Sequence, residues 1–286
     1  MIRFDFDKNK YGKELLIDCF SIAEIANEGL ALKEIHATSF YEMFFFRKVD
    51  GYILLEDTRV ELNGSAALLL PPAQPRQWHF NEQPDGMVVI FEREFIETFL
   101  KDNSLLNRLY YFGNYDALAK LPLKEGEIDL LLILLKNIKQ EIDLLASDSY
   151  HLLRAYLYQL LILVNRSYTD HYQLKGNLYR NIEILKFREL LRQHVRSRQT
   201  VKEYADLLAI NRNRLNHLCQ ETFGKNALSI IHNEILKSCK TELLTTSKTI
   251  SEISYEYNFS APSNFVRFFK ALTKISPAGY RQEYAN

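Results

Sequence analysis

The first hundred residues consist of short apolar runs separated by turn-forming residues. The runs are "YEMFFF" (41–46), "GYILLED" (51–57), "AALLLPP" (66–72), "QWHF" (77–80) and "GMVVIFE" (86–92). Residues that favour turns lie between them, at Val49-Asp50-Gly51, Asn63-Gly64, Pro71-Pro72 and Pro84-Asp85-Gly86. Many short strands at this spacing predict a β-sandwich or a small β-barrel.

After residue 100 the pattern becomes helical. Broad apolar stripes in residues 127–146 and 150–166 predict two long helices. The run "LLLILL" (130–135) fits either the core or the seam of a dimer; we favour the seam, because a barrel can cover only part of such wide stripes. The polar stretch "HYQLKGN" (171–177) is typical of a linker.

From residue 178 onward the pattern predicts seven shorter helices, near 180–196, 201–208, 212–223, 227–245, 250–257, 262–273 and 277–284. Residues 201–224 and 250–274 repeat one design, in which a short helix, a tight turn and a longer helix follow each other. We expect Asn211 to cap one longer helix, Gly224 to end it, and Pro262 to begin the other. The apolar positions expected to face inward are Leu215, Leu218, Phe223, Phe265, Phe268, Phe269 and Leu272.

Charge divides the chain in the same place. The whole chain has no net charge, but residues 175–286 hold 18 Lys and Arg against 10 Asp and Glu, a net of +8. The other 174 residues therefore carry −8. A basic terminal third is the electrostatic footprint of nucleic-acid binding. The polar face of each longer helix carries arginine, asparagine or serine, which bond to phosphates and base edges in a major groove. A solvated helix of an ordinary bundle is the alternative.

Three motifs in the basic part match a known family. They are "ISEISYEYNF" (250–259) against I-x-E-I-A-x-x-x-G-F, "SNFVRFFK" (263–270) against S-x-F-x-R-x-F-K, and "SPAGYR" (276–281) against T-P-x-x-Y-R. Residues 178–284 thus resemble the C-terminal DNA-binding domain of the AraC/XylS family of bacterial transcription regulators, which implies two helix-turn-helix units joined by a long linker helix. The departures are Ser254 for an alanine, Asn258 and Lys274 for glycines, Ile235 for an arginine and Cys219 for a phenylalanine.

The resemblance implies roles for ten residues. Those expected to read bases are Asn213, Asn216, His217, Ser263, Asn264 and Arg267. Those expected to contact phosphates are Arg212, Arg214, Lys270 and Lys274. Double-stranded DNA, RNA polymerase and a second copy of the chain are the macromolecular partners that the family implies.

The strand pattern before residue 100 resembles the cupin-like sensor domain of many AraC-family members. Metal-binding cupins supply three histidines and a glutamate, whereas this chain has His36 and Glu42 near the first motif and Arg76 in place of the second motif's histidine. We therefore expect no metal and no other cofactor. Arg76 could pair with an anionic effector, and Tyr41 and Trp78 could line its cavity. A rim arginine and core aromatic residues are the alternatives.

Together these features predict an α+β chain of three parts. Residues 1–100 form a cupin-like β-barrel, residues 101–174 a helical dimerisation or linker segment, and residues 175–286 an all-α DNA-binding domain. The predicted function is effector-responsive, sequence-specific transcription regulation by a non-enzyme. One alternative is a cupin-type metalloenzyme with an accessory basic domain, and another is a protein that acts mainly through partner contacts.

The sequence also suggests a location in the cell. No apolar run reaches the ~18 residues of a membrane span. The first residues mix charges without a signal-peptide core, and three widely spaced cysteines suggest neither disulfides nor a metal site. We therefore expect a cytoplasmic protein.

Overall fold

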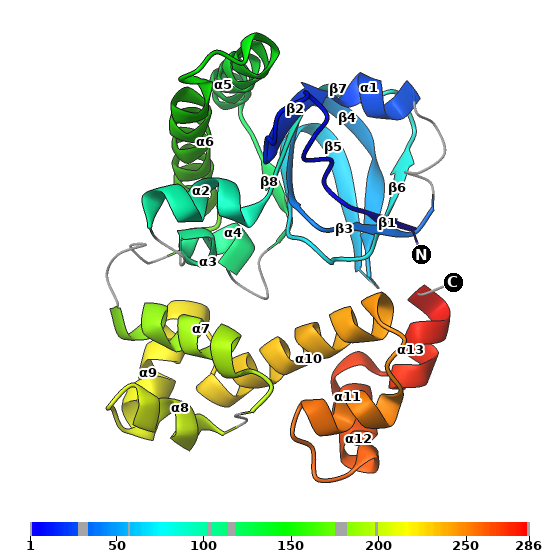
Figure 1. The fold of residues 1–286 in the computed structure, drawn as a ribbon, viewed down its shortest axis with the longest axis vertical. Helices are drawn as coiled ribbons and strands as arrows, with labels where there is room; N and C mark the ends of the chain where they lie inside the picture. The colour runs from blue at the N-terminus through cyan, green and yellow to red at the C-terminus, as the bar shows by residue number, and fades with distance from the viewer. Residues whose placement is uncertain are drawn as a thin grey trace. The chain divides into compact units, whose positions relative to one another are not determined.

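The computed structural model describes residues 2–27, 34–56, 58–101, 105–113, 118–174, 182–197 and 200–284. The chain divides into two compact units, Met1–Leu174 and Lys175–Asn286. The first unit contains a sheet followed by helices, and the described part of the second is entirely helical (Figure 1). The predicted α+β class and element order are therefore confirmed. Residues 175–177 of the junction expected at 171–177 lie outside the described residues, as does the predicted start of the next helix at residue 180.

Within the described residues of the first unit, eight strands form one mixed sheet. They are β1 (Ile2–Phe4), β2 (Ile17–Ser21), β3 (His36–Thr38), β4 (Tyr41–Leu55), β5 (Thr58–Leu70), β6 (Arg76–Phe80), β7 (Asp85–Phe91) and β8 (Lys120–Pro122). The central strand β4 pairs with β5 along most of its length. On its other edge its first half pairs with β7 and its second half with β6. This arrangement makes β4 the strand that joins two parts of the sheet.

Two of the turns predicted from the sequence are wrong. Val49-Asp50-Gly51 and Asn63-Gly64 lie inside β4 and β5, opposite each other, with Val49 paired to Gly64 and Asp50 to Asn63. The ladder is irregular between Phe46 and Val49, which is where β4 leaves β7 and joins β6. Residues typical of turns here allow a bend within a long hairpin. The hairpin itself reverses after Leu55, where Glu56 has a φ of 51°.

Two glycines allow neighbouring strands to approach closely. Gly51 has a φ of 147°, and a Cβ atom placed on it would lie 2.1 Å from the carbonyl oxygen of His79. Gly86 has a φ of 157°, and its Cβ would lie 2.1 Å from the carbonyl oxygen of Phe45. Both the backbone conformation and the space exclude a side chain. The bend of β4 between β7 and β6 therefore requires glycine at these two positions.

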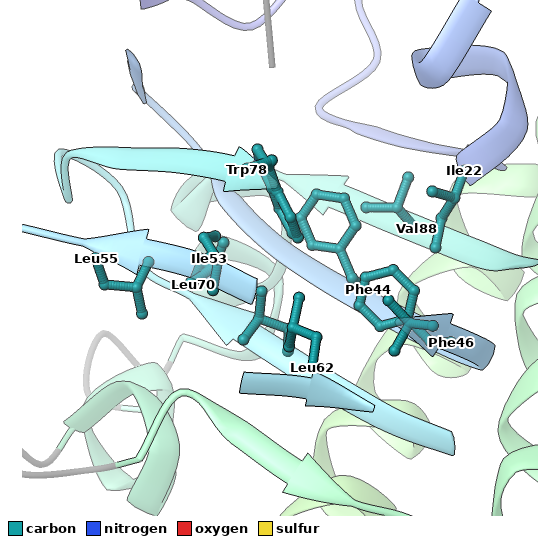
Figure 2. Close-up of a cluster of buried hydrophobic side chains, with 11 residues drawn as sticks. Ile22, Phe44, Phe46, Ile53, Leu55, Leu62, Leu70, Trp78 and Val88 are labelled. Carbon is teal, nitrogen blue, oxygen red and sulfur yellow. The ribbon is translucent and has the colours of Figure 1, made fainter. Parts of the chain in front are cut away.

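The core of the sheet is aromatic. Figure 2 shows Phe44 of β4 against Trp78 of β6, with their ring centroids 4.7 Å apart. Phe46 stacks on Phe44, and Phe80 packs against Trp78. The remaining buried members come from several strands and from helix α1: Ile22, Val49, Ile53, Leu55, Leu62, Leu68, Leu70 and Val88.

Six helices accompany the sheet within the described part of the first unit. They are α1 (Ile22–Asn27), α2 (Arg93–Leu100), α3 (Leu105–Arg108), α4 (Tyr110–Gly113), α5 (Glu125–Leu144) and α6 (Ser149–His171). Helix α5 packs on β2, β4, β5, β7 and α6. Four residues of "LLLILL" are buried in these contacts, whereas Leu130 and Ile133 are 49% and 56% exposed. Most of this run is therefore core. No helix in the described ranges is long and apolar enough to cross a membrane.

The described helices of the second unit follow the predicted ranges closely. They are α7 (Ile182–His194), α8 (Val201–Leu207), α9 (Arg212–Phe223), α10 (Ala227–Thr245), α11 (Ile250–Glu256), α12 (Pro262–Thr273) and α13 (Pro277–Tyr284). Thr200 with Glu203 and Thr249 with Glu252 form capping boxes before α8 and α11. Asn211 caps α9 through the amide of Arg214, at 2.8 Å. The predicted cap at Asn211 is therefore confirmed, and the two capping boxes are further local signals for these boundaries.

The two helix pairs also share one turn geometry. Ala209 and Asn258 both have left-handed φ angles, of 55° and 59°. In each pair the next amide bonds back to a buried residue of the first helix, from Ile210 to Ala205 and from Phe259 to Ser254, both at 3.0 Å. Ala205 and Ser254 therefore occupy equivalent positions. The Ser254 side chain is fully buried, and within the described residues its Oγ has no hydrogen-bond partner.

The close approach at β4 predicts different effects for two glycine substitutions. Gly51→Ala should lower the free energy of unfolding by about 3 kcal/mol or more, since it adds a clash to a strained φ. Gly64→Ala is the matched control, because its φ is also positive but its Cβ would meet open space. It should cost only about 1–2 kcal/mol. Urea unfolding of the full chain measures both values, and equal losses would contradict the close approach.

The equivalence of Ala205 and Ser254 predicts opposite effects for two reciprocal substitutions. Ser254→Ala removes a buried hydroxyl without a partner and should raise the free energy of unfolding by about 1 kcal/mol. Ala205→Ser introduces such a hydroxyl and should lower it by a similar amount. Calorimetric unfolding of the full chain, following the transition of the helical unit, tests both. Destabilisation by Ser254→Ala would show that its hydroxyl has a partner.

Candidate nucleic-acid interface

Helices α9 and α12 present equivalent polar stripes. When the helices are aligned on their buried residues Leu215 and Phe265, three exposed positions of one correspond to three exposed positions of the other. Those on α9 are Asn213, His217 and Gln220, and those on α12 are Ser263, Arg267 and Lys270. The spacing of three and four residues places each set on one face of its helix. The second helix of each pair thus offers hydrogen-bonding groups to the outside.

Aromatic packing holds α12 in place. Pro262 begins the helix, and Phe265 and Phe269 are fully buried. Phe269 packs edge-on against Tyr280 of α13, at 5.5 Å between centroids. Leu272, expected to face inward, is instead 41% exposed, because it lies in the last turn, beyond the packed phenylalanines. The buried stripe is therefore shorter than predicted, but it is sufficient to orient the polar face outward.

A hydrogen-bond chain fixes the exposed arginine of α12. The Nδ2 group of Asn264 donates to Ser260 Oγ, and Nη2 of Arg267 donates to Asn264 Oδ1, both at 2.7 Å. Asn264 is half-buried, whereas Arg267 is exposed. The hydrogen bond to Asn264 thus orients an exposed guanidinium that has further N–H donors.

Two cations continue this face toward the C-terminal end of α12. Lys270 and Lys274 are both exposed. Lys274 adopts a left-handed φ of 70° at the C-cap, where Gly224 ends α9 with a φ of 67°. The replacement of a glycine by Lys274 therefore adds a positive charge at the expense of some backbone strain.

The corresponding face of α9 is less cationic. Arg212 and Asn213 are exposed, but Nη2 of Arg214 lies 2.9 Å from the Glu183 carboxylate of α7. Nδ1 of His217 lies 3.1 Å from the carboxylate of Glu221, which corresponds to Ala271 in the aligned α12. Acidic neighbours thus reduce the positive field of the first helix.

Asn216 differs from the other predicted base-reading residues. Its side chain is half-buried, and its Oδ1 accepts a hydrogen bond of 3.0 Å from the amide of Ala227, the first residue of α10. The side chain thus satisfies a free amide at the start of the linker helix. The structure therefore gives Asn216 a role in joining α9 to α10.

Helix α10 connects the two helix pairs through a buried stripe. Ile230, Ile231, Ile235, Cys239 and Leu243 are all buried, and the helix contacts α7, α8, α9, α11 and α13. Ile235, which replaces the arginine usual in the family, is part of this core. Cys219, Cys239 and, in the other unit, Cys19 are buried free thiols. Burial raises the pKa of Cys219 to about 12, so this thiol stays protonated and packs as an apolar group.

A cluster of four charges joins the ends of these helices. Arg196 and Lys248 both pair with Glu242 of α10 and with Glu256 of α11. The three pairs that involve Glu256 Oε1, Glu256 Oε2 and Glu242 Oε2 measure 2.8, 2.6 and 3.0 Å. Glu242 is largely buried, so its two cationic partners are needed to offset the loss of water.

The three residues proposed for an effector pocket have other surroundings. Arg76 is only 1% exposed, so it is not a rim residue. Its guanidinium pairs with Glu42 and donates to Thr38 Oγ1 and the Pro71 carbonyl, each at 3.2 Å. Burial lowers the pKa of Arg76 to about 9, so the group stays charged at neutral pH beside the carboxylate. An anionic effector would have to compete with Glu42.

The two aromatic residues of that prediction belong to the core. Tyr41 stacks on Phe91 at 5.3 Å, and its hydroxyl accepts a hydrogen bond from Arg93. Trp78 belongs to the aromatic cluster of Figure 2. Neither they nor Arg76 lines the cavity of about 320 Å³ in this unit. Sequence reasoning missed this cavity because many of its walls come from the first 24 residues, where no strand was predicted.

Two charged residues near the predicted cupin motifs pair with each other. Within the described ranges, no group of three His, Cys, Asp or Glu side chains is placed to hold a metal ion. Glu42, which lies near the first cupin motif, is already paired with Arg76. A cation at this carboxylate would meet the positive guanidinium.

Comparison with known proteins agrees with the helical geometry. A family model described as a helix-turn-helix domain matches residues 204–283. The transposon Tn10 TetD protein of Escherichia coli is 35% identical over 65 residues, which are 23% of this chain and 47% of that protein. The chain thus spans about half the length of this curated relative.

Solved structures give more distant matches. ToxT from Vibrio cholerae covers 94% of this chain and 98% of its own, at 14% identity and a TM-score of 0.48. A transcriptional regulator from Chromobacterium violaceum, described as containing an AraC-type DNA-binding domain, covers 36% of this chain and 93% of its own, at 19% identity and a TM-score of 0.34. On the motifs, the helix pairs and the family match, the C-terminal part of this chain is an AraC-type helix-turn-helix domain.

Proposed function

We propose that this chain is a sequence-specific DNA-binding transcription regulator that inserts α9 and α12 into two successive major-groove segments. The observation that carries the proposal is the repeated helix pair, which presents equivalent exposed polar stripes on α9 and α12. A second helix held by its apolar face, with its polar face free, is the arrangement by which helix-turn-helix proteins read base edges.

The length of the linker helix α10 supports contacts of α9 and α12 with two successive major-groove segments of DNA. Helix α10 has 19 residues and is therefore about 28 Å long. One turn of DNA rises by about 34 Å. A rigid helix of this length, packed against both pairs, suits recognition helices that enter the same face of the duplex one turn apart.

The surroundings of each residue suggest its role. Arg267, oriented by Asn264, is suited to bidentate bonding with a guanine, and Ser263, Asn213 and His217 are suited to neighbouring base edges. We assign phosphate contacts to the flanking cations Arg212, Arg214, Lys270 and Lys274. Asn216 holds α10 in place, and Asn264 acts by positioning Arg267.

Two substitutions on α12 should have distinguishable effects on DNA binding. Selection from a random duplex pool should enrich one motif, and Arg267→Ala should lose preference at one position, at a cost of about 1–3 kcal/mol. Lys270→Ala should weaken binding to all sequences alike and reduce the salt slope by about 1. Lys186→Ala, which removes an exposed charge from α7, is the control and should leave the motif unchanged. Uniform weakening by Arg267→Ala would contradict base reading.

A response to small molecules would arise in the first unit. The cavity of about 320 Å³ lies within the strand-containing unit and has an apolar wall of five phenylalanines. This volume is at the low end of the range for small-molecule sites. We propose that an effector binds there rather than at Tyr41, Arg76 and Trp78.

We further propose that a second copy of the chain packs on the outer face of α5. Leu130 and Ile133 are adjacent on this helix and exposed, while the rest of the apolar run is buried. Two linked DNA-binding domains would raise affinity through effective concentration. RNA polymerase remains a partner implied by the family.

This interface can be tested by charge. The double variant Leu130→Glu, Ile133→Glu should shift sedimentation from dimer to monomer, because a dimer would bury the new carboxylates without partners. Gln159→Glu, at an exposed position on α6 instead of α5, is the control and should leave the dimer intact. A wild-type chain that sediments as a monomer, or a double variant that remains dimeric, would rule out this face as the interface.

A further inference from the structure

The cavity of the first unit combines aromatic walls with an excess of carboxylates. Its apolar lining consists of Phe4, Phe6, Phe20, Phe40, Phe44, Val88 and Ile90. Its acidic lining consists of Asp5, Asp7, Asp18, Glu24 and Glu42, and Lys10 is the one lysine among the lining residues. An apolar cavity rimmed by negative charge favours a ligand with an apolar body and a positive group.

The internal cations leave part of this negative charge uncompensated. Glu42 is paired with Arg76, Asp18 with Lys10, and Asp5 with Arg3. Glu24 Oε1 and Asp7 Oδ1 instead accept hydrogen bonds from the backbone amides of Ser21 and Asn9, at 3.0 and 3.1 Å. Neither carboxylate takes part in the three ion pairs, so the cavity lining holds more carboxylates than these pairs account for.

His36 adds an acceptor to the cavity wall. It is 2% exposed, and its Nδ1 lies 2.9 Å from the carbonyl oxygen of Glu34, so this nitrogen is the donor. In the neutral ring Nε2 is then an acceptor, and no hydrogen-bond partner for it lies among the described residues. Burial lowers the pKa of His36 to about 4, so the ring brings no positive charge at neutral pH.

Lys10 illustrates how this wall binds an ammonium group. Its Nζ lies 2.7 Å from Asp18 Oδ2 and 5.4 Å from the centroid of the Phe20 ring. A carboxylate on one side and an aromatic face on the other are the two groups that recognise alkylammonium ions. The Asp18 carboxylate is fixed in place, since it also accepts hydrogen bonds from Tyr11 and from the amide of Cys19.

We propose that this cavity binds a small organic cation, a protonated amine with an aromatic or aliphatic body. The ammonium group takes the place of the Lys10 Nζ between Asp18 and Phe20, and the body lies against the phenylalanines. Glu24 and Asp7 strengthen binding through their charge. The inference rests on the proposed function only in making this amine the effector, because binding itself needs no DNA.

Three probes of similar size separate charge from shape. Titration calorimetry on the full chain compares 2-phenylethylamine, 2-phenylethanol and 3-phenylpropanoate. The amine should bind, the alcohol should bind about tenfold more weakly, and the carboxylate should give no binding heat. Binding of the carboxylate as tight as that of the amine, or binding by none of the three, would overturn the proposal.

Substitutions in the cavity lining should change the affinity for the amine in opposite directions. Glu24→Gln combined with Asp7→Asn should weaken amine binding about tenfold, by removal of two charges. Lys10→Met should tighten it, because the internal competitor for Asp18 is lost, and a damaged fold could not produce that result. Glu14→Gln, an exposed carboxylate outside the cavity lining, is the control and should have no effect.

The outcomes remain separable from those of the DNA proposal. Amine binding that follows these variants, together with no enriched DNA motif, would support the cavity and reject the regulator. An enriched motif without amine binding would support the regulator and reject the cavity as an amine site. Unchanged amine affinity in both the acidic variant and Lys10→Met would reject this site for the amine.

Discussion

The burial of one face of α10 is the contact on which the geometry of the helical unit depends. This helix touches both helix pairs and α13, and its buried stripe contains isoleucines, Cys239 and Leu243. Ile235 strengthens this stripe, because a buried arginine would need partners that an isoleucine does not. The charges at the helix end, where Arg196 and Lys248 share Glu242 and Glu256, fix the second pair against α10. The relative placement of α9 and α12 is thus a consequence of packing within one unit.

In the strand-containing unit, the comparable constraint is the bend of β4. Because β4 pairs with β7 before the bend and with β6 after it, a single strand brings Phe44 and Phe46 against Trp78 and Val88. Gly51 and Gly86 make these pairings possible by removing side chains from the closest approaches. The same alternation turns Glu42 and Phe44 to the cavity and Tyr41 and Met43 away from it. The site therefore depends on the register of this strand.

The helix boundaries of the helical unit could be predicted closely from its sequence, whereas the strand boundaries of the sheet could not. Capping residues such as Thr200, Asn211 and Pro262 act over one turn of helix, so a single sequence contains the whole signal. Asn63-Gly64 has the composition of a turn, but its conformation is decided by the distant segment at Val49, to which it pairs. The ion pair between Arg76 and Glu42 could not be predicted either, because the two residues lie far apart in the sequence. Sequence rules therefore predict helix ends, which depend on neighbouring residues, but they do not predict strand pairing, which depends on distant residues.

The two helix pairs share their backbone geometry but differ in the charges on their exposed faces. The two pairs share a capping box, a left-handed turn residue and the same amide bond across the turn, although Ala209 and Asn258 are not glycines. Their outer faces nevertheless differ, since Glu221 and Glu183 offset charge near α9 while Arg267 and Lys270 stand without acidic neighbours on α12. Because phosphate attraction scales with uncompensated charge, α12 should contribute more to affinity than α9. In the proposed binding mode, we therefore expect Asn213 and His217 of the first pair to contribute more to selectivity than to affinity.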